Sequence, residues 1–397
     1  MPTCIYHKDC FEKASGEHVL QNFLGARWTS DRIVCDALQA EFGKTIDAAF
    51  ERGLRPIRTL LGSRGGRGER GPALKGLNMS SGERVDLDPG GRPRLAEPIV
   101  KVQPLPEGDR VSIQAGTAEQ IDWAMHKLRQ QRPDIADRID PKDVQAKMEK
   151  AKGHIPGHLQ LQLQLGGRDY FRGMLKSCIN LLGATSTEAV LDPSLDPVRR
   201  FVMSGEGELA NFVRFPTSLD PIPVPKLGQF GHFVGMVTRN GNIEGVVQLF
   251  GGLVHPFQLA NGHSGTAINC GYAVDPTRES KPAEDRNPPF KATDIPIFSS
   301  QREKPDTDVF AAYTKQVNRF LKAVHERADG AMVNEIVQQA LGPPDGRPIT
   351  DEMIAELSQR LAQKIVARYS RRPSPECDTD GRGTPHCQTK TQISDLG

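Results

Sequence analysis

The chain has 397 residues and a mass of 43.6 kDa, which suggests two or three domains at roughly 150 residues each. Its 37% hydrophobic and 25% charged residues are typical of a soluble globular protein and exclude a fibre or a wholly disordered chain. With a formal net charge of only +2, a nucleic-acid partner would have to be held by local basic patches. The sequence has no run of roughly 20 apolar residues and no signal-peptide pattern at its start, so we expect a cytoplasmic protein with no membrane partner.

The cysteines are unevenly placed along the chain. Their positions are Cys4, Cys10, Cys35, Cys178, Cys270, Cys377 and Cys387. In a reducing compartment the first three are better explained as metal ligands than as disulfides. Cys178 and Cys270 stand alone in apolar contexts, so we expect them to be buried as small hydrophobic residues.

Residues 1 to about 62 predict one compact unit. Strand-like segments at 4–6 and 33–35 precede a helix that begins at Asp36. Apolar residues recur every four positions in this helix and define one buried face: Leu38, Phe42, Ile46 and Phe50. Gly43 lies inside the helix at a cost of about 1 kcal/mol relative to Ala, so we expect it to allow close backbone approach.

The most basic part of the chain follows this helix. Residues 63–72 read Ser-Arg-Gly-Gly-Arg-Gly-Glu-Arg-Gly-Pro, a segment called here the arginine-glycine loop. Such a segment is either a flexible linker with solvated arginines or an arm that contacts phosphates. The candidate phosphate contacts are Arg52, Arg55, Arg58, Arg64 and Arg67.

Periodicity predicts further strands and helices along the rest of the chain. The expected elements are a hairpin at 98–114, helices near 117–131 and 141–152, a strand at 158–165, an apolar helix at 170–182, a β-rich block at 210–275, a linker at 276–304, helices near 306–329, 331–341 and 350–370, and a disordered tail from 371. Within the β-rich block, Asn240-Gly241 between two apolar runs is a strong hairpin signal.

Three short motifs occur in a fixed order near the start. They are Cys4-Ile5-Tyr6-His7, then Glu17-His18-Val19-Leu20, then Val34-Cys35-Asp36-Ala37-Leu38-Gln39-Ala40-Glu41-Phe42-Gly43. Together they resemble an HNH endonuclease, in the variant that carries two Cys-x-x-Cys-like pairs, Glu-His, and Asn-Asn at the start of a helix. The resemblance covers about 60 residues. It implies a ββα-metal fold, in which two short strands and a helix enclose one catalytic cation.

The resemblance assigns roles to three side chains. His18 would be the general base that takes a proton from water, and Glu17 would be a ligand of the catalytic cation. Gln39, at the position of the family's helix-start Asn, would complete this metal site with its longer side chain. A hard ion such as Mg²⁺ suits oxygen ligands, and a cation can offset charge on the phosphate oxygens.

The sequence also departs from the family pattern. Leu38 stands in place of the second cysteine of the later pair, and Ala40 in place of the second Asn. A structural Zn²⁺ normally takes four Cys or His ligands. A ligand set of Cys4, His7, Cys10 and Cys35 is one possibility, with His7 at the position of the family's second cysteine; a site repacked around Leu38 is the other.

These patterns predict an α+β protein. The expected parts are an HNH-like nuclease domain at 1–75 that includes the arginine-glycine loop, a mixed α+β domain at 80–275, a C-terminal helical segment at 305–370 and a disordered tail at 371–397. The leading expectation is metal-dependent endonuclease activity on nucleic acid, in particular DNA. One alternative is a degenerate module that binds nucleic acid or protein without cleavage. Another is a nuclease switched by a regulatory ligand or protein partner through residues 80–370.

Overall fold

The computed structural model describes residues 1–12, 14–106, 108–146, 158–216, 221–222, 227–277, 301–302, 304–342 and 348–369. Helices and sheets are both present, which confirms the expected α+β class. The disordered tail expected from residue 371 lies outside these ranges, as does most of the linker expected at 276–304. No helix in the described part of the chain is both long and apolar enough to cross a membrane.

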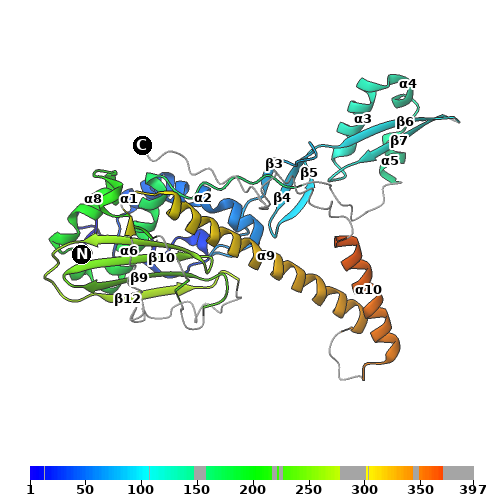
Figure 1. Ribbon diagram of the computed structural model, residues 1–397. Coiled ribbons are helices and arrows are strands. Elements are labelled where there is room, and N and C mark those ends of the chain that lie inside the picture. Colours follow the sequence, from blue (N-terminus) through cyan, green and yellow to red (C-terminus); the bar gives the residue numbers. More distant parts are fainter. Residues whose placement is uncertain are drawn as a thin grey trace, which may run out of the picture.

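The N-terminal residues form a ββα arrangement, whose helix is labelled α1 in Figure 1. Strand β1 (Glu17–His18) pairs antiparallel with β2 (Thr29–Ser30), and the 3₁₀ turn η1 (Asn22–Leu24) lies between them. Helix α1 (Asp36–Lys44) follows. The strands predicted at 4–6 and 33–35 are wrong, because these segments form a turn and a loop. They do lie side by side, since the Ile5 amide donates to the carbonyl of Ile33 at 2.9 Å.

The single helix predicted from Asp36 to beyond Phe50 is two helices. Thr45 lies outside helical φ and ψ, so α1 ends and α2 (Ile46–Leu61) begins there. The predicted apolar face is confirmed, because its four members are all buried. Gly43 does not allow a close approach as expected: a methyl group there would meet nothing within 4 Å.

A small second unit has its own core. Strands β3 (Leu74–Asn78), β4 (Arg84–Asp88) and β5 (Arg92–Leu95) lead to it. It consists of the expected hairpin, β6 (Ile99–Leu105) with β7 (Gly108–Gln114), and helices α3 (Gln120–Gln131), α4 (Pro133–Ala136) and α5 (Pro141–Ala146). Its core includes Ile121, Met125 and Leu128. The helix predicted at 141–152 is confirmed over α5, and its remainder from 147 lies outside the described residues.

The strand predicted at 158–165 is wrong. Backbone pairing is confined to the neighbourhood of Leu159, which bridges to Met79, so this alternating segment has no continuous strand partner in the described structure. The apolar helix expected at 170–182 is confirmed as α6 (Arg168–Thr185). Short turns of helix follow: α7 (Thr187–Val190), η2 (Pro193–Leu195), α8 (Asp196–Ser204) and η3 (Leu209–Asn211).

A four-stranded antiparallel sheet of order β11-β10-β9-β12 lies against α6. Its strands are β9 (His232–Arg239), β10 (Asn242–Leu249), β11 (Leu253–Ala260) and β12 (Asn269–Val274). The predicted Asn240-Gly241 hairpin is confirmed, with φ values of 50° and 74° that suit these residue types. Cys178 and Cys270 are buried, as expected. A short pair, β8 (Phe215–Pro216) with β13 (Gln301–Arg302), lies near the start of the next helix.

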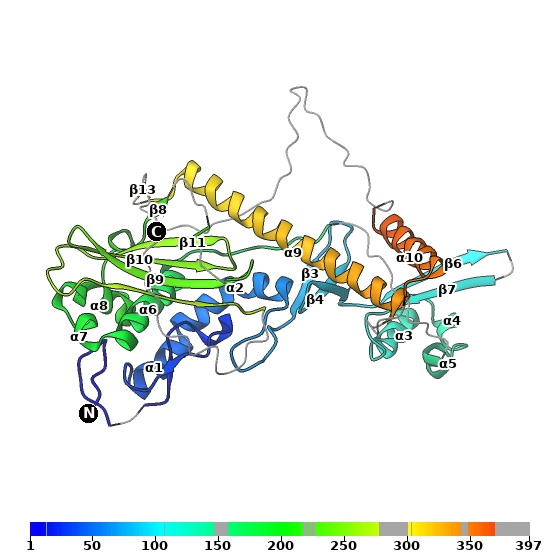
Figure 2. The ribbon, with the colours of Figure 1, turned by 90° about the horizontal axis from the view of Figure 1, so that it is seen from below.

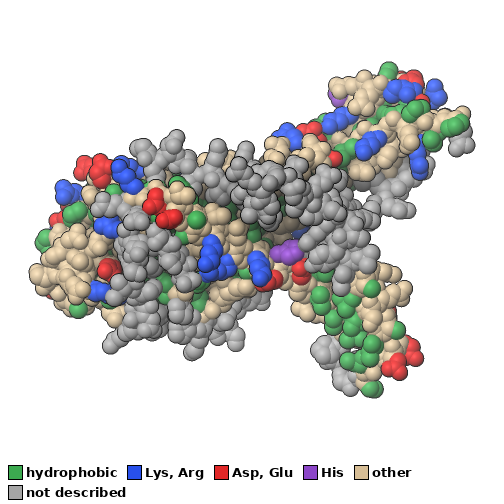
Figure 3. All heavy atoms as spheres, in the orientation of Figure 1, with side chains coloured by type: hydrophobic (Ala, Val, Ile, Leu, Met, Phe, Trp, Pro, Cys, Tyr) green, Lys and Arg blue, Asp and Glu red, His purple; other side chains and the backbone are tan. Residues whose placement is uncertain are grey.

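The two helices predicted at 306–329 and 331–341 are one 35-residue helix, α9 (Thr307–Leu341). It starts beside β11 and runs out to α10 (Asp351–Tyr369), which folds back along it (Figure 2). On the face drawn in Figure 3, hydrophobic side chains gather over this helical arm.

One hydrophobic core joins the N-terminal ββα unit, α6 and the large sheet. Helices α2 and α6 approach closely because glycines lie between them. A methyl group on Gly173 would fall 2.9 Å from Phe50 Cβ, and one on Gly53 would fall 2.9 Å from Tyr170 Cδ2. The packing of α6 against α2 fixes the surroundings of β1.

Candidate active site

The side chain of Glu17 points from β1 into the core, where it pairs with a lysine from α6. Lys176 Nζ is 2.7 Å from Glu17 Oε1 and 2.6 Å from Asp47 Oδ2, and the lysine side chain is only 1% exposed. The same ammonium lies 5.1 Å from the centre of the Phe42 ring. Burial works to lower the pKa of Lys176, but the charges of Asp47 and Glu17 raise it overall. Lys176 is therefore a buried cation held by two carboxylates.

Further hydrogen bonds fix this ion pair in place. Asn180, one turn along α6 from Lys176, donates to Glu17 Oε1 at 3.2 Å and to the His18 carbonyl at 2.9 Å. Its own amide oxygen accepts from the Tyr6 hydroxyl at 2.9 Å. Burial raises the pKa of Glu17, and Lys176 opposes that rise. These bonds tie β1 to α6 through buried polar groups.

A second chain of hydrogen bonds holds Asp47 on α2. The Gln21 amide donates to Asp47 Oδ1 at 3.2 Å and to the Gly173 carbonyl at 2.8 Å. The Ser177 hydroxyl donates to Gln21 Oε1 at 2.9 Å. These bonds hold the Asp47 carboxylate against the Lys176 ammonium.

His18 is half-buried, next to Glu17 on β1. Successive residues of a strand point to opposite faces, so the Glu17 carboxylate faces the core while His18 faces away from it. Burial, followed by the charges of Arg67 and Lys176, lowers the pKa of His18 to about 4. The imidazole is therefore neutral at pH 7 and can accept a proton, but its low pKa makes it a weaker base than an ordinary histidine.

The arginine-glycine loop folds against the segment that follows β1. The Gly66 amide donates to the Asn22 carbonyl at 2.8 Å, and Arg27 Nε donates to the Gly66 carbonyl at 2.8 Å. The side-chain Nδ2 of Asn22 also donates to Glu69 Oε1 at 2.6 Å. These contacts keep the exposed Arg67 near His18. The arginine-glycine loop is thus attached to the segment between β1 and β2, next to His18 in the chain.

The five candidate phosphate contacts differ in exposure. Arg52, Arg64 and Arg67 are exposed, and Arg55 is half-buried. Arg58 differs from the expectation: its side chain is 2% exposed, pairs with Glu51 at 2.7 Å and lies over the Phe23 ring. Arg58 lies on the buried face of α2, so its guanidinium is not exposed to bind a phosphate.

Gln39, on the first turn of α1, turns toward the residues that precede β1. Its Oε1 accepts from the Ser15 hydroxyl at 2.8 Å, and its Nε2 donates to the Gly16 carbonyl at 3.3 Å. The Ser15 hydroxyl oxygen also lies 2.8 Å from Asp36 Oδ1, so its single proton is shared between these two acceptors. In this arrangement Gln39 bridges α1 to the segment before β1.

The donor atoms expected for a catalytic cation do not fit one as they are arranged. Glu17 Oε1 is taken by the Lys176 ammonium and by Asn180. Gln39 Oε1 is taken by Ser15. A divalent cation at Glu17 would have to lie beside a buried ammonium, which like-charge repulsion disfavours.

A separate cluster of metal-ligating side chains joins the start of the chain to the start of α1. Ligand atoms of Cys4, His7 and Cys35 lie within 4.8 Å of one another, so this cluster can hold a metal ion. His7 Nε2 is 3.2 Å from Cys35 Sγ. Cys10 is exposed, pairs its backbone with Thr3 and is not part of this cluster. Three of the four expected zinc ligands therefore come together.

Sequence reasoning overlooked Lys176 and Asn180. Both lie in a helix that it had recognised as apolar, and they are four positions apart, on one face. The sequence did contain a signal for these two residues: a lysine and an asparagine four positions apart in an apolar helix. Such groups are rarely buried unless they have a polar partner, so the spacing indicated a buried polar contact.

No protein-family model, curated protein or solved structure matches this chain. Its function must be argued from these residues.

Proposed function

We propose that the N-terminal ββα unit, which resembles the HNH arrangement but lacks its catalytic cation site in the described residues, is an endonuclease unit that binds the backbone of nucleic acid, DNA in particular, and hydrolyses a phosphodiester bond. The observation that carries the proposal is a half-buried His18 on a ββα scaffold, with the loop that bears the exposed Arg67 hydrogen-bonded to Asn22 and Arg27 next to it in the chain. A general base and a positive charge at the phosphate are the two contributions that this hydrolysis needs.

In the proposed reaction, water lies between His18 and the scissile phosphate. The imidazole accepts a proton as the water oxygen forms a bond to phosphorus, and the bond from phosphorus to the leaving sugar oxygen breaks. Solvent supplies the proton for that leaving oxygen. Arg67, with Arg64 beside it on the arginine-glycine loop, offsets charge on the phosphate oxygens. No step involves a divalent cation, since Glu17 and Gln39 do not fit one.

A second candidate is a module that binds nucleic acid without cleaving it. One specific observation favours it: the Lys176 ammonium occupies the place beside the Glu17 carboxylate where a catalytic cation would have to bind. In that case the same arginines would bind the backbone, and His18 would line the interface.

Plasmid cleavage separates the two candidates. The wild type, His18→Ala and the matched control His126→Ala, an exposed histidine on α3, would be assayed with Mg²⁺, with Mn²⁺ and with EDTA. We expect cleavage by the wild type and the control, and a loss of roughly 10²- to 10⁴-fold in His18→Ala. Absence of cleavage under all three conditions would favour the binding module, and equal cleavage by all variants would remove His18 from the mechanism.

We further propose that Cys4, His7 and Cys35 bind a structural zinc ion. Thiolates and imidazole are the ligands that zinc prefers, and water or another group would complete the usual four. The ion would link residues 4–7 to the N-terminus of α1 and so set the position of β1.

A further inference from the structure

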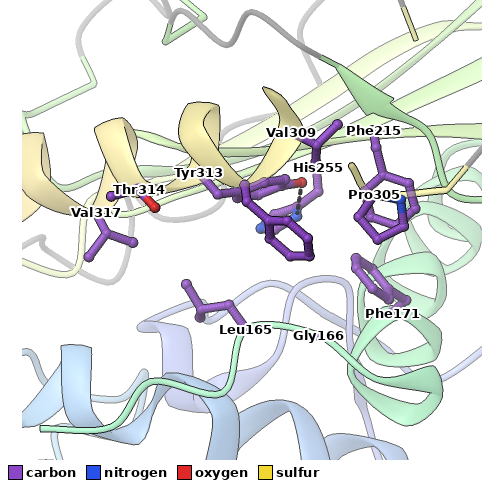
Figure 4. A pocket seen from close by; sticks show the side chains of 11 residues that line it. Leu165, Gly166, Phe171, Phe215, His255, Pro305, Val309, Tyr313, Thr314 and Val317 are labelled. Carbon is purple, nitrogen blue, oxygen red and sulfur yellow. Dashed lines mark hydrogen bonds between the residues drawn. The ribbon is translucent and has the colours of Figure 1, made fainter. Parts of the chain in front are cut away.

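A small pocket lies between α6, β8, β11 and α9 (Figure 4). Its walls are almost wholly apolar, and include Leu165, Phe171, Phe215, Val309 and Val317. The cavity has a volume of about 80 Å³. On the scale where one water takes roughly 10–15 Å³, this is room for roughly five to eight water-sized groups. The space is suited to a single aromatic ring or a short branched alkyl group.

One polar side chain lines this pocket with a hydrogen-bonding atom unused. His255 on β11 is 1% exposed. Its Nδ1 is 3.1 Å from the Tyr313 hydroxyl, whereas its Nε2 has no hydrogen-bond partner among the described residues. In Figure 4 this second nitrogen points toward the space between Leu165 and Val317. A buried polar atom without a partner is costly, and a ligand atom can remove that cost.

The charge state of the imidazole defines what this atom can bind. Burial lowers the pKa of His255 to about 3, so the ring is neutral and carries one proton. Burial also raises the pKa of Tyr313, which keeps its hydroxyl protonated. When this hydroxyl donates to Nδ1, the imidazole proton lies on Nε2, which then is a donor.

We propose that this pocket binds a small apolar molecule, of the size of one aromatic ring, that carries one oxygen able to accept a hydrogen bond from His255 Nε2. The walls supply the binding energy through burial of apolar surface, and the imidazole selects for the oxygen. This site is independent of the proposed nuclease function. It lies within residues 80–370, for which a regulatory ligand was one expectation.

The test uses phenol and toluene as probes of matched size on the full-length protein. Isothermal titration calorimetry should show both binding, with phenol tighter by about 2- to 12-fold because of the one extra hydrogen bond. Thr314→Phe, which enlarges a half-buried residue of the pocket lining, should abolish binding of both. The matched control Ala311→Phe, on the exposed face of α9, should bind as the wild type does. Circular dichroism confirms that each variant is folded.

A third variant tests the imidazole itself. His255→Phe keeps an aromatic ring in the pocket but removes Nε2, so we expect phenol to lose its advantage over toluene. The proposal is overturned if neither probe binds the wild type, if Thr314→Phe binds phenol as tightly as the wild type, or if His255→Phe keeps the full preference for phenol.

Discussion

The ammonium of Lys176 lies 2.7 Å from Oε1 of Glu17 and is almost completely buried. Glu17 is one of the two residues of the Glu-His motif, yet its carboxylate forms a buried ion pair and does not face a substrate. The lysine that pairs with Glu17 is 159 positions away in the chain. Packing of α6 thus decides which half of the motif can meet a substrate.

Replacement of Lys176 should therefore be severe. Lys176→Met leaves the carboxylates of Glu17 and Asp47 without their buried counter-ion, and we expect the free energy of unfolding to fall by about 3–5 kcal/mol. Urea denaturation would measure it, with Lys322→Met on the exposed surface of α9 as the matched control, expected to change stability by less than about 0.5 kcal/mol. The double variant Lys176→Met/Glu17→Gln should recover part of the loss. A single-variant loss no larger than that of the control would contradict the buried pair.

The pKa of His18 gives a pH prediction. Because this pKa falls from 6.5 to about 4 on folding, the unfolded chain takes up the proton more readily. The contribution of His18 to stability is therefore complete above pH 6.5 and is lost as the pH falls toward 4. His18→Gln should show a weaker decline in unfolding free energy between pH 6.5 and 4.5. NMR of the imidazole Cε1 proton measures the titration directly, and a midpoint near 6.5 would refute the expected burial.

Nucleic-acid binding should depend on Arg67 and not on the exposed Lys322 of α9. Arg67→Ala removes an exposed guanidinium, so the affinity for duplex DNA should fall uniformly across sequences and the salt dependence should lose about one phosphate contact. Lys322→Ala removes one exposed positive charge from α9 and should leave binding unchanged. Fluorescence anisotropy between roughly 50 and 200 mM salt gives both slopes. Identical slopes for wild type and Arg67→Ala would place the DNA elsewhere.

Metal content should distinguish Cys35 from Cys10. Purified wild-type protein should contain one zinc ion per chain by plasma mass spectrometry, and Cys35→Ser should contain little. Cys10→Ser should keep its zinc, because that thiol is not in the cluster. A strong chelator should lower the melting temperature of the wild type but not of Cys35→Ser. Loss of zinc from both variants would show that Cys10 joins the site.

Two glycines should respond to alanine in opposite directions. Gly43→Ala adds a methyl group in open space on a helix, so stability should rise by about 0.5–1 kcal/mol. Gly173→Ala places its methyl carbon 2.9 Å from Phe50 Cβ, so stability should fall by about 1–3 kcal/mol despite the better helix propensity. Thermal unfolding of the two variants tests this, and a gain from Gly173→Ala would show that α2 and α6 can separate freely.

Local patterns predicted much of the secondary structure. Apolar patterns located the buried face of α1 and α2 and all but the ends of α6, and Asn240-Gly241 located its hairpin. The segment at 158–165 alternates like a strand but has no continuous partner, and pairing is a tertiary property. Where the helix from Asp36 breaks was likewise not predicted, because the residue type of Thr45 does not require its backbone conformation.

The sequence by itself determined the order of the motifs, the α+β composition and the neighbouring placement of Glu17 and His18. Only the tertiary structure decided what each of them does, because strand geometry separates their side chains and α6 then supplies a cation to one of them. The same folding collected Cys4, His7 and Cys35 without Cys10, and buried Arg58 among apolar residues. A pattern specifies which groups are near in the chain, whereas burial and charge pairing depend on contacts between distant segments.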